Sequence, residues 1–164
     1  MFKLRQTIIA LTGLGMCCWP VYAEEAAASL DDLHLSDGLR TLLRTEMREI
    51  AGASQAIVMS FVSGDWKSVL HISEQIRASY ILERSLSDTQ KQELQEKLPD
   101  RFKRLDMEFH ARAGKLGLAA ASENAETVAF HFYRLLETCA TCHAAYAQSR
   151  FPGFSSETPD AHHH

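Results

Sequence analysis

The chain has 164 residues, 46% of them hydrophobic, and a formal net charge of −4. This length and composition are typical of a single globular domain. Acidic residues outnumber basic ones, 21 against 17, and a nucleic-acid-binding domain would instead need a basic surface, so we expect no nucleic acid as a partner.

The first 23 residues have the form of a signal peptide. Two basic residues precede an apolar run over 7–19, and Val21-Tyr22-Ala23 supplies a small-residue cleavage signal. We therefore expect export, a mature chain that starts at Glu24 and a net charge of −6 once Lys3 and Arg5 are removed. Because the apolar run is too short to span a bilayer comfortably, we expect no stable membrane insertion.

The chain has four cysteines, and two of them fall in the leader. A lipid-anchored alternative would use Cys17 or Cys18, but Met16 stands where such sites carry a small residue. We therefore expect both to be lost on cleavage, which leaves Cys139 and Cys142 in the mature chain.

The first two predicted helices follow a loosely ordered segment, 24–35. Ser36 or Asp37 can cap a helix that runs to Val62 before Gly64. Its expected inward stripe, at three- and four-residue spacing, consists of Leu39, Leu43, Met47, Ile50, Ser54, Ile57, Val58 and Phe61. Asp65 can cap a second helix that extends to about Glu83, with Trp66, Val69, Leu70, Ile76 and Tyr80 inward.

Three further helices are expected after this point. Ser87 to Gln90 has the form of a capping box and opens a short helix that ends before Pro99. A long helix over 100–121 places Phe102, Leu105, Phe109, Ala113, Leu116 and Ala120 on one face, and another over 124–148 places Val128, Phe132, Leu135 and Leu136 inward. The predicted fold is all-α: an antiparallel four-helix bundle over 36–151, with an extra short helix between the second and third long helices.

The string Cys139-Ala140-Thr141-Cys142-His143 continues the apolar stripe of the last helix. Two thiols three residues apart can add to the two vinyl groups of one porphyrin, and the histidine that follows can ligate its iron. On a helix all three side chains project from about one face. The motif predicts one covalent haem c; a chance Cys-x-x-Cys or a dithiol redox motif is the alternative. The tail over 152–164 is expected to be loosely ordered, and His162-His163-His164 to be part of an expression tag.

With four helices, a haem motif at the end of the last one and the aromatic Tyr146 three residues after His143, the chain resembles the class II cytochromes c, the cytochrome c′ group and its low-spin relatives. The resemblance implies a sixth-ligand position on the first helix, a few residues after an arginine. Met47, after Arg44 and between Leu43 and Ile50, matches that position. One departure is Ala147, where many cytochromes c′ carry a basic residue.

Two alternatives to Met47 remain open at the sixth position of the iron. His110 could ligate the iron or act in the haem pocket without ligating it, and an open site is the other alternative. Methionine opposite histidine would favour the ferrous state and suit electron transfer.

The sequence therefore predicts a periplasmic monohaem electron carrier, not an enzyme, that meets redox partner proteins. Binding of nitric oxide or carbon monoxide at a five-coordinate iron is the alternative function, and weak peroxidase-type chemistry is a more remote one. Because class II proteins commonly pair through their first two helices, the resemblance leaves a homodimer open.

Overall fold

The computed structural model describes residues 34–80 and 85–154. Its elements in chain order are α1 (Asp37–Val62), α2 (Trp66–Arg77), α4 (Asp88–Lys97), α5 (Asp100–Ala121), α6 (Ala125–Tyr146) and a 3-10 turn, η2 (Pro152–Phe154). These residues contain no strand, so the all-α prediction is confirmed for them. The expected signal peptide, its cleavage site and the histidine tail lie outside the described residues.

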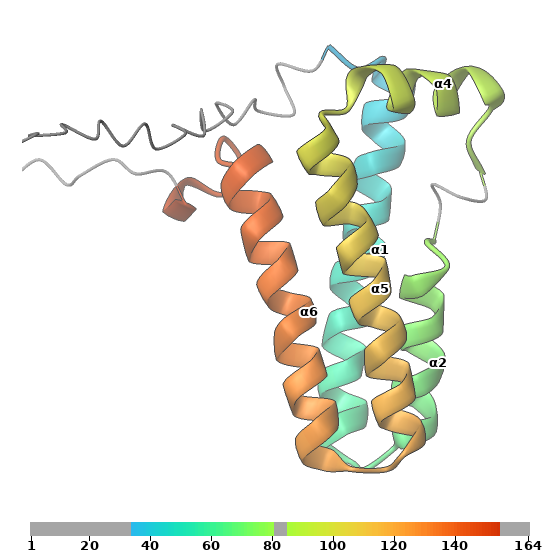
Figure 1. Cartoon of the computed structure of the whole chain (residues 1–164), viewed down its shortest axis with the longest axis vertical. Coiled ribbons are helices and arrows are strands. Elements are labelled where there is room, and N and C mark those ends of the chain that lie inside the picture. The colour runs from blue at the N-terminus through green and yellow to red at the C-terminus, as the bar shows by residue number, and fades with distance from the viewer. Residues whose placement is uncertain (1–33, 81–84, 155–164) are drawn as a thin grey trace, which may run out of the picture.

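The helices α1, α2, α5 and α6 run along the long axis of the molecule, and α4 lies across one end (Figure 1). In the view of Figure 1, α5 lies in front of α1, with α2 and α6 on either side. The closest packing joins α5 to α2 and to α6, and α1 to α2. The last turns of α6 point toward the end that carries α4, so the Cys-x-x-Cys-His segment lies at that end (Figure 1). None of the described helices is long and apolar enough to cross a membrane.

The predicted helix starts are confirmed by their capping side chains. The side chain of Ser36 accepts from the first turn of α1, that of Asp65 from α2 and that of Asn124 from α6. Ser87 and Gln90 form both hydrogen bonds of the capping box at the start of α4. These starts could be predicted because each cap satisfies amide groups within three residues of itself.

The predicted end of α2 is wrong. The helix ends at Arg77 and not near Glu83, and Ser79 takes a left-handed φ of 58°. The Ser79 hydroxyl and the Tyr80 amide both donate to Oε1 of Glu46, at 2.8 and 2.9 Å. Glu46 is only 1% exposed, so these two bonds satisfy a buried carboxylate that would otherwise be costly to bury.

Replacing Glu46 with alanine should lower the free energy of unfolding by about 2–4 kcal/mol, because two buried donors lose their acceptor. Glu49→Ala, at an exposed position of the same helix, should change it by less than about 0.5 kcal/mol. Urea unfolding of the two variants checks this. Equal stability of both would mean that Glu46 does not hold α1 against the end of α2.

The predicted inward stripes are partly wrong. Residues Leu39, Leu43, Ile50 and Ile57 are buried as expected, and Glu46 and Ala53 join them. Met47, Val58 and Leu136 are instead 44%, 46% and 41% exposed. Successive helical residues are about 100° apart, so with Glu46 inward Met47 lies on the flank of the buried stripe and not in its middle.

The centre of the core lies where α5 approaches α2. Residues Ile57, Val69, Ile76, Leu116, Val128 and Leu135 are fully buried there. A Cβ at Gly117 would lie 3.3 Å from Leu70 Cδ1 and 3.3 Å from Glu74 Oε1. Glycine at this position therefore lets the two helix backbones approach closely.

The two ends of the described residues lie next to α4 and α6. Leu35 is buried, and the carbonyl of His34 accepts from Lys97 Nζ at 2.6 Å. Residues 152–154 form the turn η2. The expectation of loose order over 24–35 and 152–164 stays a prediction.

Candidate functional site

Cys139, Cys142 and His143 occupy the last two turns of α6, and all three side chains are half-buried. Their spacing places them on about one face of the helix, within roughly 100° of rotation. Both thiols are free, and Cys139 Sγ lies 3.5 Å from the Leu135 carbonyl oxygen. The helix therefore presents two thiols and one imidazole together, as the sequence predicts.

An apolar cluster from α4, α5 and α6 surrounds Cys142. Leu98, Phe102 and Tyr146 are buried in this cluster, and Leu105 packs against it. The Phe102 and Tyr146 rings meet edge to face with centroids 5.3 Å apart. Tyr146 thus belongs to the apolar cluster against which Cys142 packs.

Burial raises the pKa of both thiols. For Cys142 the pKa rises to about 11, because burial and the negative charge of Asp106 outweigh the opposing positive charge of Arg101. The pKa of Cys139 is also raised, mainly by burial. Both groups are therefore protonated at neutral pH, whereas redox-active dithiols have lowered pKa values and sit at helix N-termini or beside cations. The geometry disfavours a dithiol oxidoreductase.

His143 has an imidazole that is free to ligate. Its ring stacks on Phe151, with centroids 4.6 Å apart and planes at 15°. Burial lowers the pKa of His143, which favours the neutral form that metal ions require. No hydrogen bond to either ring nitrogen is found among residues 34–80 and 85–154. The Phe151 stack, which orients the ring, had no signal in the sequence.

The residues predicted on the first helix lie on α1 as expected, with different exposures. Leu43 and Ile50 are buried, Arg44 is exposed, and Met47 is 44% exposed. The neighbouring Glu46 faces the end of α2, so Met47 points about 100° away around the helix axis. The thioether is therefore accessible and is not packed in the α1–α2 interface.

Both ring nitrogens of His110 face polar groups of other residues. Its Nδ1 donates to the Ile76 carbonyl at 2.7 Å, and its Nε2 lies 3.6 Å from Asp106 Oδ1. Burial alone would lower the pKa of His110, but the hydrogen bond and charge of Asp106 outweigh it and raise the pKa, with smaller contributions from Ile76 and Glu46. The ring thus links α5 to the last turn of α2.

A hollow of about 420 Å³ opens between α1, α4 and α5, and its lining includes Leu43, Leu94, Leu98, Phe102 and Asp106. Neither cysteine lines it, but Leu98 and Phe102 also belong to the cluster around Cys142. Within the described ranges, no three His, Cys, Asp or Glu side chains converge as a metal site. The motif on α6 and this hollow are therefore neighbours that share an apolar wall.

Comparison with models of protein families, with curated proteins and with solved structures found no match for this chain. The functional argument therefore depends on the chemistry of its own residues. Among these, the half-buried thiols and imidazole at the end of α6 are the most specific group.

Proposed function

We propose that this protein is a periplasmic, monohaem c-type cytochrome of the class II kind that carries single electrons between redox proteins. The observation that supports it best is the set formed by Cys139, Cys142 and His143: two half-buried thiols and one half-buried imidazole on one helix face. A bound haem would supply a one-electron iron couple. The signal-peptide pattern agrees with this proposal, because thiol addition to haem takes place outside the cytoplasm.

We further propose that α1, α2, α5 and α6 form an antiparallel four-helix bundle, with α4 as the additional short helix. The close packing of α5 on α2 and α6, and of α1 on α2, supports this arrangement. In bundles of this kind, cofactor sites are built from side chains on facing helices. A rigid frame also suits electron transfer, which needs the surroundings of the redox centre to change little.

In this proposal His143 is the proximal ligand and Met47 the distal one. Phe151 stacks on the His143 ring, and Tyr146 and Phe102 belong to the apolar cluster against which Cys142 packs. The exposed thioether of Met47 is a soft, neutral donor that favours ferrous iron. His110 is a weaker candidate, because Nε2, the ring nitrogen left over by the bond from Nδ1 to Ile76, faces Asp106.

The direct test is whether the haem is covalent. Protein produced with a haem-attachment system should keep its haem through acid-acetone extraction and contain no titratable thiol, since both sulfurs are consumed by vinyl addition. In a Cys139→Ala/Cys142→Ala variant any bound haem should pass into the acetone. Haem lost from the parent protein, or two free thiols in it, would contradict the proposal.

The second candidate is binding of a small gas such as nitric oxide or carbon monoxide at a five-coordinate iron. The 44% exposure of Met47 favours it, because packing holds only part of this side chain in place. The absorption spectrum of the oxidised and reduced protein separates the two functions, since low-spin His/Met and high-spin five-coordinate haems differ plainly.

A further inference from the structure

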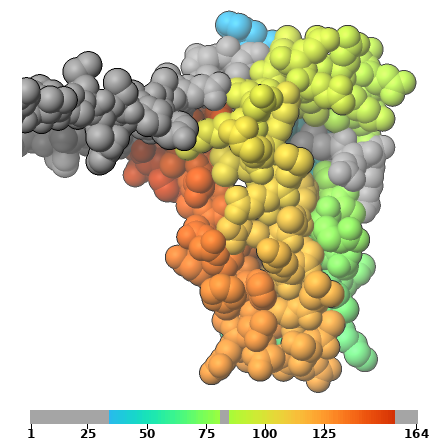
Figure 2. All heavy atoms as spheres, in the orientation of Figure 1, coloured from blue at the N-terminus to red at the C-terminus, as the bar shows by residue number. Residues whose placement is uncertain are grey.

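A basic surface lies along the junction of α5 and α6. We call it the α5/α6 basic surface; its charged and ionisable members are Arg101, Arg104, Arg112, Lys115, His131 and Arg134. Part of it surrounds a hollow of about 290 Å³ that Phe130 also lines. Figure 2 shows this face of the molecule, with α5 and α6 toward the viewer.

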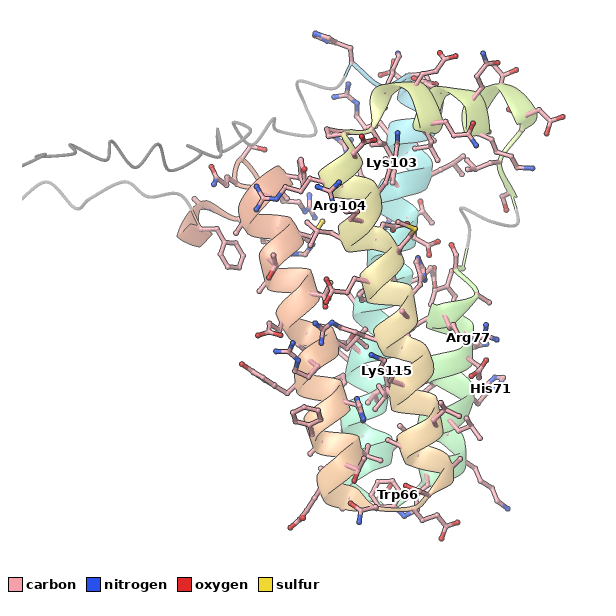
Figure 3. The ribbon with its side chains drawn as sticks, in the orientation of Figure 1. Trp66, His71, Arg77, Lys103, Arg104 and Lys115 are labelled. Atoms are coloured by element: carbon pink, nitrogen blue, oxygen red, sulfur yellow. The ribbon has the colours of Figure 1, made fainter. Side chains whose placement is uncertain are left out.

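The positive charge of this surface is only partly neutralised. Glu108 pairs with Arg112, and Glu137 pairs with Arg134. Arg104 and Lys115 are exposed and form no ion pair within the described ranges; both lie on α5, well apart along its length (Figure 3). A chain with a net charge of −4 therefore carries a local excess of positive charge here.

Large apolar side chains accompany these cations. Phe130 is 57% exposed, and Met107 and Leu118, on the outer side of α5, are 63% and 74% exposed. Protein interfaces are enriched in aromatic residues, methionine and arginine. The basic side chains themselves are solvent-accessible and none is deeply buried, so the surface suits a broad protein contact better than a small anion.

The surface reaches the proposed cofactor site. Arg101, at its α4 end, is close enough for its charge to act on the Cys142 thiol. Cys142 is on α6, and it packs against the apolar cluster that contains Phe102 of α5. A protein that covered this surface would therefore approach the helix that holds the haem motif.

We infer that the α5/α6 basic surface is the docking site for an acidic face of a redox partner protein. The inference rests on the proposed electron-carrier function for its physiological meaning, but the binding itself does not require haem. Complementary charge steers such encounters and raises their association rate, and the effect weakens with salt.

The binding test uses the mature chain and fluorescently labelled poly-L-glutamate, followed by fluorescence anisotropy at low and physiological ionic strength. Arg104→Glu/Lys115→Glu should weaken binding by about tenfold or more at low salt. The matched control is Lys67→Glu/Lys91→Glu, which reverses two exposed charges on α2 and α4 and should weaken binding by less than about threefold.

Each contrary outcome identifies a different error. Equal losses in the two double variants would mean that only net charge matters, and no binding by the parent protein would remove the acidic partner altogether. Binding to vesicles containing anionic phospholipid, without binding to poly-L-glutamate, would make the surface a membrane contact instead. Any of the three overturns the inference.

A kinetic test separates this inference from the haem proposal. Reduced protein passes one electron to hexacyanoferrate(III), giving hexacyanoferrate(II), and to the cationic oxidant tris(1,10-phenanthroline)cobalt(III). The Arg104→Glu/Lys115→Glu variant should react about tenfold more slowly with the anion and no more slowly with the cation. If no haem is present this assay fails for every variant, whereas the poly-L-glutamate result still stands or falls independently.

Discussion

A His143→Ala variant should lose the low-spin haem spectrum and become strongly destabilised. The imidazole is half-buried and stacked on Phe151, and its removal would leave the haem without its proposed proximal ligand. Losing the protein contact of an obligate cofactor is one of the few single changes that produce large destabilisation. We expect the free energy of unfolding to fall by more than about 3 kcal/mol.

The absorption spectrum and thermal unfolding of the holoprotein check this prediction. His71→Ala is the matched control, because His71 is exposed on α2 (Figure 3); it should leave both measurements unchanged. Added imidazole should partly restore the low-spin spectrum of His143→Ala, which a purely structural role for His143 would not allow. An unchanged spectrum and melting temperature in His143→Ala would refute the axial role.

The helix starts and the helical placement of the Cys-x-x-Cys-His segment could be predicted because the physics that fixes them is local. Ser36, Asp65, Ser87 and Asn124 cap amide groups within three residues of themselves. The Cys139 to His143 spacing likewise depends only on helix geometry. Neither prediction depends on which other helix lies nearby.

The features that the sequence did not predict correctly depend on contacts between distant parts of the chain. The end of α2 is set by Ser79 and Tyr80 bonding to Glu46, more than thirty residues earlier. Charged residues are rarely buried, so the apolar pattern predicts Met47 in the inward stripe, whereas the structure buries Glu46 there. The stack of Phe151 on His143 depends on the turn that follows α6, and no local sequence pattern predicts this stack.

Substitution of the half-exposed Met47 tests whether its thioether is the sixth ligand of the iron. Met47→Ala should convert a low-spin spectrum into a high-spin one and lower the reduction potential, since the soft thioether that favours ferrous iron is removed. Carbon monoxide should bind the ferrous variant faster than the parent, because it no longer has to displace a ligand. Spectroscopy, potentiometry and carbon monoxide binding measure the three effects.

The free energy of unfolding of Met47→Ala can also show whether the thioether binds the iron, because Met47 is not fully buried. Truncating a buried core methionine costs about 2–5 kcal/mol whatever it touches, but a residue 44% exposed in the chain alone should cost less than about 1.5 kcal/mol through packing. Met59→Ala, at a 68% exposed position of the same helix, supplies the reference. A fall well beyond that of Met59→Ala would therefore indicate a bond to the iron.

The outcome also decides between the two proposed functions. A parent protein that is high-spin, and remains so in Met47→Ala, would remove Met47 from the iron and favour gas binding at an open site. A protein that stays low-spin after the substitution would make His110 the sixth ligand through Nε2, which would have to turn from Asp106 to the iron while Nδ1 keeps its bond to Ile76. His110→Ala in the Met47→Ala background should then produce the high-spin spectrum, because the last competing ligand is gone.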